Sequence, residues 1–323
     1  MCPQRDAAVP ALAREGVIQA RADNRWRIAE SIRKSQLDSG RRAAVVLLRS
    51  GSKTVPDLTS MLQFVDLLRA QLHRLGYDLH VADPSVQGAS RLDAILSQLD
   101  AEYRPSFYIL HSIPPAFHRR FERQEVPAII VGSHEPDSGL PSIDINPDLL
   151  MRHAVHYLAG RGHRRIALLN LPSGSFGVSR RKEIFLRSCK ERSRDGVSGL
   201  VITRPSRPDA VEAAVRRMFR HRPPTAVVVT QLEYLIELYT TLGQLGLRIP
   251  QDVSVLSEYY LPVMAFLRPV PTAYDWPTQS FVTRIIRLMR DYLRLRIWPR
   301  ASWNIIPDLK EGRSVATIRH RID

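Results

Sequence analysis

The chain has 323 residues, enough for two domains and a sizeable hydrophobic core. Hydrophobic residues make up 44% of it and charged residues 24%, which excludes wholesale disorder. The sequence holds no apolar run of membrane-helix length, no signal-peptide layout at its start and only two cysteines, Cys2 and Cys189. We therefore expect a cytosolic protein without membrane contact, disulfide framework or four-cysteine zinc site.

The net charge is strongly positive. The 47 basic and 32 acidic side chains give +15 at pH 7, and a polyanion such as nucleic acid is the obvious partner of so basic a chain. The basic residues are mostly arginine and are scattered along the whole sequence, however, and a GC-rich genome would produce the same composition. The charge permits a nucleic-acid partner without requiring one.

The first 41 residues differ in character from the rest. The pattern predicts a short helix over Ala7–Arg14, disturbed by Pro10, and then two short strands, Val17–Ala20 and Arg25–Ile28, around a turn. A polar connector follows over Lys34–Arg41. Because this piece is too short to hold a core of its own, we expect it to be the remnant of a larger module.

From residue 42 onward, strands and helices are predicted in alternation. The run Ala43–Leu48 is apolar without interruption, which is typical of a strand covered on both faces of a parallel sheet. A helix over Leu62–Leu75 follows, with apolar residues at helical spacing and Gly76 placed to end it. The remaining predicted elements of this run are strands at Tyr77–Ala82, Phe107–Leu110 and Ala128–Val131 and helices at Arg91–Leu99 and Ala116–Gln124.

The alternation restarts after residue 146. The predicted helices are Asp148–Ala159, Arg180–Glu191, Asp209–Arg220 and Glu233–Gly243, and the predicted strands are Ile166–Leu169, Gly199–Thr203, Thr225–Val229 and Val253–Leu256. Repeated βα units form right-handed crossovers and parallel sheets with helices on both faces. We predict an α/β fold of two doubly wound parallel-sheet lobes, with the ligand in the cleft at the carboxyl ends of the strands.

The predicted division of the chain follows from these two runs. Residues 1–41 are the partial N-terminal module and connector, and residues 42–323 are the two-lobed domain. Lobe 1 is expected to take about 42–146 and 272–298, and lobe 2 about 147–271 and 299–318. A last amphipathic helix after Pro271 has arginines at positions 284, 287, 290 and 294 opposite its apolar face. That row could touch phosphate, although a solvated face explains it more simply.

Two stretches carry a resemblance to a known family. The first is Ser142-Ile-Asp-Ile-Asn, followed by Arg152-His-Ala-Val-His-Tyr-Leu-Ala-Gly-Arg-Gly-His-Arg-Arg-Ile-Ala-Leu-Leu169. The second runs from Pro224-Thr-Ala-Val-Val-Val-Thr through Gly246-Leu-Arg-Ile-Pro-Gln-Asp-Val-Ser-Val-Leu256. In order and spacing they resemble the ligand-binding lobes of LacI/GalR-type transcriptional regulators, over about Arg42 to Ala316. The resemblance implies a type I periplasmic-binding-protein-like fold.

The start of the chain resembles a different module. Glu15-Gly-Val-Ile18, followed by Trp26-Arg-Ile28, is similar to the end of a GntR-type winged helix-turn-helix, where the last helix leads into the wing hairpin. That module's first helices would lie upstream of Met1, so either the chain begins late relative to its gene or the protein has lost direct DNA reading. Arg21, Arg25 and Arg27 are the candidates for phosphate or minor-groove contact, and a hairpin kept soluble by charge is the alternative.

The family resemblance also suggests ligand contacts. Its "arginine–x–x–glycine–phenylalanine" segment, whose arginine holds sugar hydroxyls or a carboxylate, is matched by Arg181-Lys-Glu-Ile-Phe185, with isoleucine in place of glycine. The alternative for Arg181 is a surface arginine on a helix rich in them. The further candidates stand where the family has polar residues of the cleft or directly after the first strand; they are Ser50, Asn146, Gln231 and Tyr259.

Two acidic residues of the family pattern are missing. Leu232 replaces an aspartate after Gln231, and Tyr259 replaces the usual hydroxyl acceptor. Carboxylates bind sugar hydroxyls through charge-assisted hydrogen bonds, whereas glutamine and tyrosine form neutral ones. The hypothesis is an altered or less polar ligand, or a cleft that no longer binds a sugar.

Enzymatic and metal functions have little support in the sequence. Ser173-Gly-Ser-Phe-Gly177 lacks the spacing of a nucleophile elbow and fits a loop at the carboxyl end of a strand. His153, His156 and His163 could suggest a metal, but no cysteine accompanies them, and a solvated helix end explains them better. We expect no enzyme, no metal and no cofactor.

These observations predict a transcriptional regulator. A small molecule, a sugar or related metabolite, would bind between the lobes, and closure would change how a homodimer presents its DNA-binding heads to an operator. The alternative is a sensor that has no DNA-binding ability of its own and acts through a protein partner.

Overall fold

The computed structural model describes most of the chain. The described residues are 18–20, 26–28, 43–49, 55–82, 89–111, 113, 115–123, 127–134, 138–170, 176–204, 207–295 and 302–318. The predicted helix Ala7–Arg14, the connector Lys34–Arg41 and the candidate residues Ser50, Arg21 and Arg25 lie outside them, as does the side chain of Arg27. In the described part, no helix is long and apolar enough to cross a membrane.

The N-terminal segment contains the expected pair of strands. The strand β1 (Ile18–Ala20) lies antiparallel to β2 (Trp26–Ile28), with Ile18 opposite Ile28. The prediction of two short strands is confirmed. The turn itself lies outside the described residues.

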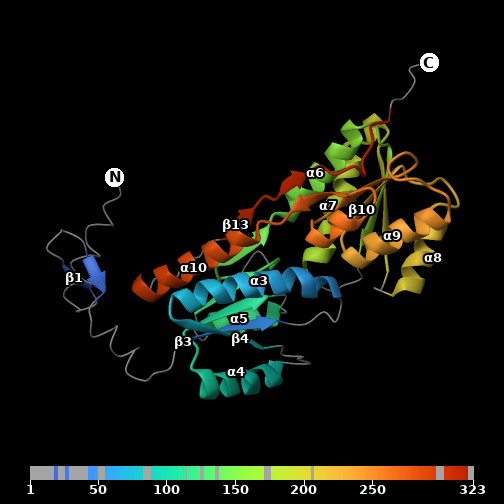
Figure 1. Cartoon of the computed structure of the whole chain (residues 1–323). Coiled ribbons are helices and arrows are strands. Elements are labelled where there is room, and N and C mark those ends of the chain that lie inside the picture. The colour runs from blue at the N-terminus through green and yellow to red at the C-terminus, as the bar shows by residue number, and fades with distance from the viewer. Residues whose placement is uncertain are drawn as a thin grey trace.

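Lobe 1 is a six-stranded parallel sheet in the order β13-β7-β6-β5-β3-β4 (Figure 1). Its strands are β3 (Ala43–Arg49), β4 (Tyr77–Ala82), β5 (Phe107–His111), β6 (Ala128–Val131), β7 (Ser142–Ile145) and β13 (Ser302–Ile305). Its helices are α3 (Val55–Arg74), α4 (Ala89–Tyr103), α5 (Pro115–Arg123) and α10 (Thr278–Leu295). The helices α3 and α10 pack together on one face of the sheet, while α4 and α5 cover the other.

The apolar run of β3 is explained by the helices that cover both faces of this sheet. Val45 and Leu47 belong to the core beneath α3 and α10, whereas Val46 and Leu48 belong to the core beneath α4 and α5. All four side chains are fully buried. Successive side chains of a strand point to opposite faces, so a strand between two layers of helices has no position for a polar residue.

Lobe 2 repeats the architecture in the order β14-β12-β11-β10-β8-β9. Its strands are β8 (Arg165–Asn170), β9 (Ser198–Thr203), β10 (Ala226–Val229), β11 (Ser254–Ser257), β12 (Thr272–Asp275) and β14 (Asp308–Lys310). Its helices are α6 (Pro147–Gly160), α7 (Phe176–Glu191), α8 (Pro208–Met218) and α9 (Leu232–Gln244), with short 3-10 turns at Ser193–Asp195 and Pro262–Phe266. The strands of this sheet pair in parallel except at β12 and β14, which are antiparallel. The predicted fold class, two doubly wound α/β lobes, is confirmed.

Within the described ranges the chain crosses between the lobes three times, after β7, between β12 and α10 and between β13 and β14. Two of these crossings differ from the predicted boundaries at 272 and 299, because β12 lies in the lobe 2 sheet and β13 in the lobe 1 sheet. Both strands have only four residues, and β13 alternates between exposed and half-buried positions. Neither has the apolar run by which the other strands were predicted.

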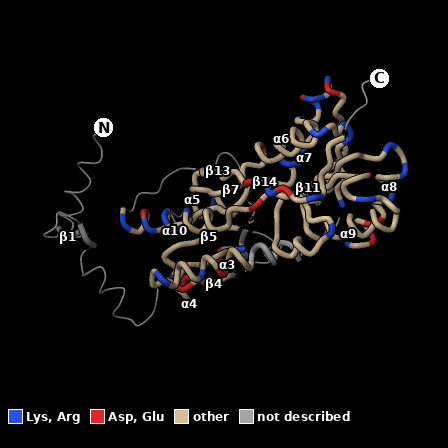
Figure 2. Tube along the Cα trace, turned by 45° about the horizontal axis from the view of Figure 1, so that its top comes forward, with Lys and Arg blue, Asp and Glu red and all other residues tan. Residues whose placement is uncertain are grey.

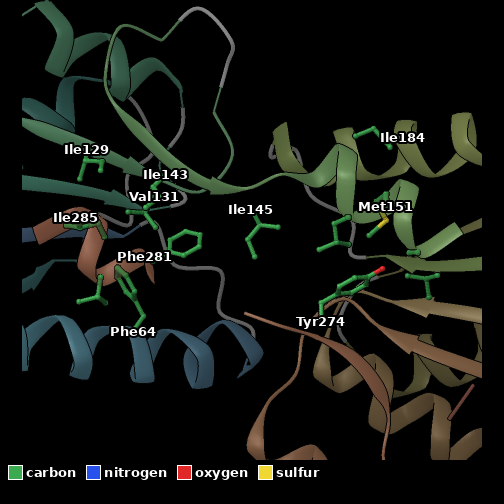
Figure 3. Close-up of a cluster of buried hydrophobic side chains, with 14 of the residues drawn as sticks. Phe64, Ile129, Val131, Ile143, Ile145, Met151, Ile184, Tyr274, Phe281 and Ile285 are labelled. Carbon is green, nitrogen blue, oxygen red and sulfur yellow. The ribbon is translucent and has the colours of Figure 1, made fainter. Parts of the chain in front are cut away.

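One hydrophobic cluster continues from lobe to lobe. It contains the α3 and α10 face of the lobe 1 sheet and the α6 and α7 face of the lobe 2 sheet. Figure 3 shows Ile145 midway, between Phe281 of lobe 1 and Met151 of lobe 2. Ile145 is the last residue of β7, so the first crossing passes through the core.

Within the described residues the predicted elements are found, and most of their ends shift by a few residues at most. The exception is α3, which begins at Val55 and not at the predicted Leu62. The strands at Tyr77–Ala82 and Ala128–Val131 have the predicted bounds. The helix α7 begins at Phe176 instead of Arg180, so Gly177, which we had expected in a loop, is helical. The strands β7, β12, β13 and β14 were not predicted as such.

Candidate functional site

A cavity of about 300 Å³ lies between the lobes, at the carboxyl ends of the parallel strands. Lobe 1 contributes Gln63, Phe64, His111, Val131, Thr278 and Phe281. The second crossing contributes Trp276, and lobe 2 contributes Arg181, Thr230, Gln231, Glu258, Tyr259, Tyr260, Leu261, Pro262, Asp275 and Lys310. A volume of this size is at the small end of the range for small-molecule sites.

Two residues of the lobe 1 wall, His111 and Val131, end neighbouring strands, and Arg49, which does not line the cavity, ends the next strand. Arg49 of β3 lies beside His111 of β5, which lies beside Val131 of β6. Since side chains alternate along a strand, all three point to the α3 and α10 face, as do Val45 and Ile109. The row therefore faces the same side of the sheet as Phe64 and Phe281 of the cavity.

Arg49 and His111, the two basic residues of this row, are close in space, and each has a polar atom without a hydrogen-bond partner. Burial and the positive charge of Arg49 lower the pKa of His111 to about 4, so its ring is neutral at physiological pH. His111 Nδ1 and Arg49 Nη2 are both buried, and neither atom has a hydrogen-bond partner in the structure. A guanidinium donor and an imidazole nitrogen, both buried, thus remain without a hydrogen-bond partner beside the cavity.

The lobe 2 wall contains an ion pair. Arg181 Nε of α7 lies 2.5 Å from Glu258 Oε1, which follows β11, and the side chain of Glu258 is 5% exposed. Burial raises the pKa of Glu258, while Arg181 acts in the opposite direction. The main-chain oxygen of Glu258 also accepts a hydrogen bond from Trp276 Nε1 at 3.3 Å. The carboxylate therefore occupies a dry position next to one counter-charge.

A second acidic group, Asp144, faces this pair from lobe 1. Asp144 Oδ2 accepts a hydrogen bond of 2.7 Å from Ser133 Oγ, and Asp144 Oδ1 accepts one from the Ile145 amide. Burial raises the pKa of Asp144 to about 6, although Ser133 and Arg181 both lower it. Because Arg181 acts electrostatically on Asp144 and on Glu258, it couples a carboxyl group of each lobe.

Five phenylalanine, tyrosine and tryptophan side chains also line the cavity. Phe64 and Phe281 come from the lobe 1 helices, and Trp276 stacks on Phe281 with ring centroids 6.4 Å apart. Tyr259 and Tyr260 come from lobe 2, where the ammonium group of Lys310 lies 3.8 Å above the Tyr260 ring. Such walls suit a ligand with a ring or other apolar body.

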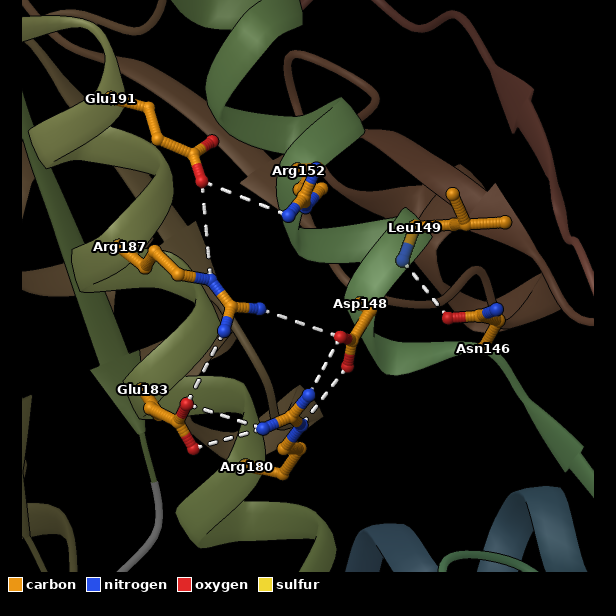
Figure 4. Close-up of polar contacts among 8 residues, drawn as sticks. All are labelled: Asn146, Asp148, Leu149, Arg152, Arg180, Glu183, Arg187 and Glu191. Carbon is orange, nitrogen blue, oxygen red and sulfur yellow. Dashed lines mark hydrogen bonds and ion pairs between the residues drawn. The ribbon is translucent and has the colours of Figure 1, made fainter.

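The structure brings three of the predicted ligand residues together. Arg181, Gln231 and Tyr259 line the cavity. Asn146 does not line it: its Oδ1 accepts a hydrogen bond of 3.0 Å from the Leu149 amide and caps α6 (Figure 4). Ser50 lies outside the described residues. The role of these residues in binding stays a prediction.

The arginine next to Arg181 in the sequence has a different environment. Arg180 forms hydrogen bonds of 2.8 and 3.1 Å to Asp148 of α6, and Arg187, two helical turns further along α7, approaches the same carboxylate and Glu183 (Figure 4). These groups are partly exposed and join α6 to α7. Successive residues of a helix point about 100° apart, so Arg180 serves packing while Arg181 faces the cavity.

The cavity contains acidic groups, although Leu232 and Tyr259 replace the two acidic residues of the family pattern. Glu258 and Asp275 both line the cavity. Glu258 stands directly before Tyr259, the position that we had aligned with the family's acceptor, and Asp275 ends β12, which the sequence pattern did not predict. Aligning single positions with the family motif did not find these two carboxylates, because they stand at other positions of this chain.

Several residues that line the cavity were not predicted from the sequence, although the sequence contained a signal for one of them. His111 follows directly on the predicted strand Phe107–Leu110, so the rule that ligands bind at strand ends could have found it. Trp276 and Lys310 depend on strands that the pattern did not predict, and no sequence signal pointed to them.

The histidines considered as metal ligands have other partners. His153 Nδ1 is 2.8 Å from Tyr274 Oη, and His163 contacts Thr225 Oγ1 and the main-chain oxygen of Ala316. Across the described ranges, no group of three or more histidine, cysteine, aspartate or glutamate side chains could hold a metal ion.

Comparisons with known proteins agree with this geometry. Residues 155–315 match the family model of the periplasmic binding protein-like domain. This part of the chain has the periplasmic-binding-protein-like fold. It contains β8 to β12, β14 and most of α6, and hence nearly all of lobe 2 together with Arg181, Gln231 and Tyr259 of the cavity.

The similarity to regulators extends beyond the periplasmic-binding-protein-like domain. The chain is 25% identical over 263 residues to the HTH-type transcriptional regulator reg1 of Streptomyces lividans, covering 79% of this chain and 76% of that protein. A LacI family transcriptional regulator from Bifidobacterium animalis superposes with a TM-score of 0.74 and 17% identity over 86% of this chain and 100% of that one. A dimeric Lac repressor superposes with a TM-score of 0.73 and 17% sequence identity, and the match covers 85% of this chain and 100% of that one. The two lobes therefore share the LacI-like fold.

Charge is spread over the molecule. Figure 2 shows lysine and arginine along both lobes, with acidic residues among them. Many arginines lie within 4.0 Å of an acidic side chain, as Arg120 does with Asp93 and Arg216 with Glu212. The positive charge of the described lobes does not by itself mark a nucleic-acid surface.

Proposed function

We propose that the protein is a transcriptional regulator that binds a small polar metabolite, a sugar or a related compound, between its two lobes. The cavity between the lobes supports this best, because its walls belong to different lobes and its polar groups stand at the strand ends. The regulators among its relatives support the same class of function.

The mechanism follows from the shared walls. A ligand that contacts His111 on lobe 1 and Arg181 on lobe 2 makes all its contacts only when the lobes are close together. It therefore stabilises the closed arrangement by its difference in affinity for the two arrangements. Closure changes the relative orientation of the lobes, and any domain attached to lobe 1 moves with it.

The response is read out through DNA. The hairpin of β1 and β2 would serve as the wing of a winged helix-turn-helix, with Arg21, Arg25 and Arg27 near the phosphate backbone or the minor groove. A homodimer would place two such heads on the two halves of an operator. The dimeric Lac repressor, which has the same two-lobed fold, supports this arrangement.

The test combines ligand binding with DNA binding. Thermal shift against a panel of sugars, sugar phosphates and organic acids identifies an effector, and gel shift with DNA from upstream of the gene then compares the chain with a version extended by the in-frame upstream codons. We expect one of the two to bind DNA and the effector to change that affinity by about 5- to 150-fold. If an effector closes the lobes but neither form binds DNA, the protein is a sensor that acts through a protein partner, and the proposal is wrong.

A further inference from the structure

We infer that the effector carries an acidic group, a carboxylate or a phosphate, and that Arg49 and His111 bind it at the lobe 1 wall of the cavity. This inference rests on the proposed ligand-sensing function and names the class of ligand. Neither residue belongs to the motifs from which the family was recognised.

The first support is the state of the two side chains. Arg49 Nη2 and His111 Nδ1 are buried without a hydrogen-bond partner. A buried donor without an acceptor costs free energy, and a guanidinium without a counter-charge costs more. Arg181 has the carboxylate of Glu258 as its counter-ion, and Lys310 is exposed to solvent. The described residues supply no ion pair to Arg49, whose Nη2 is buried.

The second support is position. Arg49 and His111 are adjacent across β3 and β5 in the sheet register, on the same face, at the carboxyl edge where the lobes meet. His111 lines the cavity, and Arg49 is near enough for its positive charge to lower the pKa of the His111 ring. A neutral imidazole can donate one hydrogen bond while the arginine supplies charge and further donors, which suits the oxygens of an anion.

The third support is the sign of the charges around the site. On the far side of the cavity, Lys310 adds a cation and the Arg181–Glu258 pair is neutral as a unit. Asp275 is the lining carboxylate that no described cation neutralises, and it lies on lobe 2 at the end of β12. An anion bound at His111 thus meets the two basic residues of β3 and β5, while the two carboxylates that line the cavity, Glu258 and Asp275, lie on lobe 2; Asp144 of lobe 1 does not line it.

The experiment follows His111 directly. Protein with ¹³C-labelled histidine is titrated with inorganic phosphate, benzoate and neutral benzamide at constant ionic strength, and the His111 signal is assigned by its loss in His111→Gln. We expect the signal to shift saturably with phosphate, with benzoate or with both, and to respond at least tenfold more weakly to benzamide. A response to phosphate alone identifies a phosphate ligand, and a response to benzoate alone identifies a carboxylate ligand.

Two variants separate binding from folding. Arg49→Gln removes the charge, and we expect it to weaken anion binding by about 10- to 100-fold, as for loss of a charged hydrogen bond. Since this arginine has no counter-ion in the described structure, the melting temperature without anion should stay the same or rise. Arg120→Gln, at an exposed arginine of α5 on the other face of the sheet, is the control and should bind anions as the unmodified chain does.

The result that overturns the inference is equally specific. If His111 does not respond to either anion, or if Arg49→Gln binds them with unchanged affinity, no anion site exists at this wall. These measurements need no DNA, so failure of the regulatory function leaves them valid. Conversely, a neutral effector that changes DNA affinity would retain the proposed function and refute the acidic ligand.

Discussion

The charged residues of the cavity control one another's charge. Arg181 is the counter-charge of Glu258 and also favours ionisation of Asp144, so one guanidinium influences two carboxyl groups on different lobes. In a site from which water is largely excluded, such coupling is stronger than at the surface. Substitutions at these residues should therefore have effects that depend on pH.

Replacing Arg181 should destabilise the protein most at high pH. In Arg181→Met the buried Glu258 loses its counter-ion, and we expect the free energy of unfolding at pH 8 to fall by about 3 kcal/mol. Near pH 5 the loss should be smaller, because burial raises the pKa of Glu258 and the group can bind a proton instead of remaining charged. Urea unfolding at both pH values measures the difference.

The double variant provides the control for this interpretation. Adding Glu258→Gln to Arg181→Met removes the buried charge, so part of the stability at pH 8 should return. An equal loss at pH 5 and pH 8, with no recovery in the double variant, would show that the arginine acts through packing alone.

Asp144 should make the protein less stable as pH rises. Its folded pKa is about 6, above the ordinary value of 3.8, so the folded state binds the proton more tightly than the unfolded state. The free energy of unfolding therefore decreases as pH rises from about 4 to 6, and the contribution is constant above that range. Asp144→Asn should remove this decrease, whereas Asp66→Asn, at an exposed carboxylate, should keep it. Unfolding curves at half-unit pH steps test it, and parallel pH profiles for the unmodified chain and Asp144→Asn would contradict it.

At the scale of elements, the last described segment holds lobe 2 together. Ser314 is fully buried between β11 and β12; its Oγ donates to the Val255 oxygen at 2.5 Å and accepts from the Thr272 amide at 2.8 Å. Its main-chain oxygen accepts from the Val255 amide. Gly162 belongs to the same arrangement, since its φ of +90° and the nearby Ile318 oxygen leave no room for a side chain. The segment 311–318 completes the sheet that carries half of the cavity.

Ser314→Ala should lower the stability of the protein by about 1 to 3 kcal/mol, because it leaves the buried Thr272 amide without an acceptor. Ser198→Ala is the matched control: Ser198 is exposed on β9, with a single 3.3 Å hydrogen bond to the Arg164 oxygen, and should change stability by less than about 0.5 kcal/mol. Chemical denaturation of both variants checks this, and similar losses for the two would refute the role of Ser314.

At the scale of the whole molecule, the lobes meet closely at one point beside the cavity. Gly177, in the first turn of α7 on lobe 2, faces Ser133, which follows β6 on lobe 1. A Cβ atom at position 177 would lie 2.6 Å from Ser133 Oγ and 2.9 Å from Ser133 Cβ. Rotating the serine hydroxyl does not remove the second contact, so a side chain here separates the lobes.

Gly177→Ala should therefore favour the open arrangement and weaken effector binding. We expect an affinity loss of about tenfold, measured by calorimetry, with the radius of gyration from X-ray scattering staying larger at saturating ligand. Removing the opposing side chain in Gly177→Ala with Ser133→Gly should restore most of the affinity. If the single variant binds normally, or if the second change restores nothing, the contact does not limit closure.

The sequence by itself determined the layers of this protein. Apolar runs such as Ala43–Leu48 and Ala128–Val131 mark central strands because both faces of each sheet are buried, and helical spacing marks the covering helices. Arg181, Gln231 and Tyr259 were also found in advance, because they lie in stretches that resemble the family.

Only the tertiary structure decided how the lobes join and what the cavity contains. The strands β12, β13 and β14 are short and lie at or near a sheet edge, so no pattern distinguishes them from loops, yet Asp275 and Lys310 reach the cavity through them. Asn146 was predicted to contact the ligand, and only the structure shows that its side chain caps α6 and does not line the cavity. The pairing of Glu258 with Arg181 joins residues 77 positions apart, and such a contact depends on three-dimensional packing that local sequence does not encode.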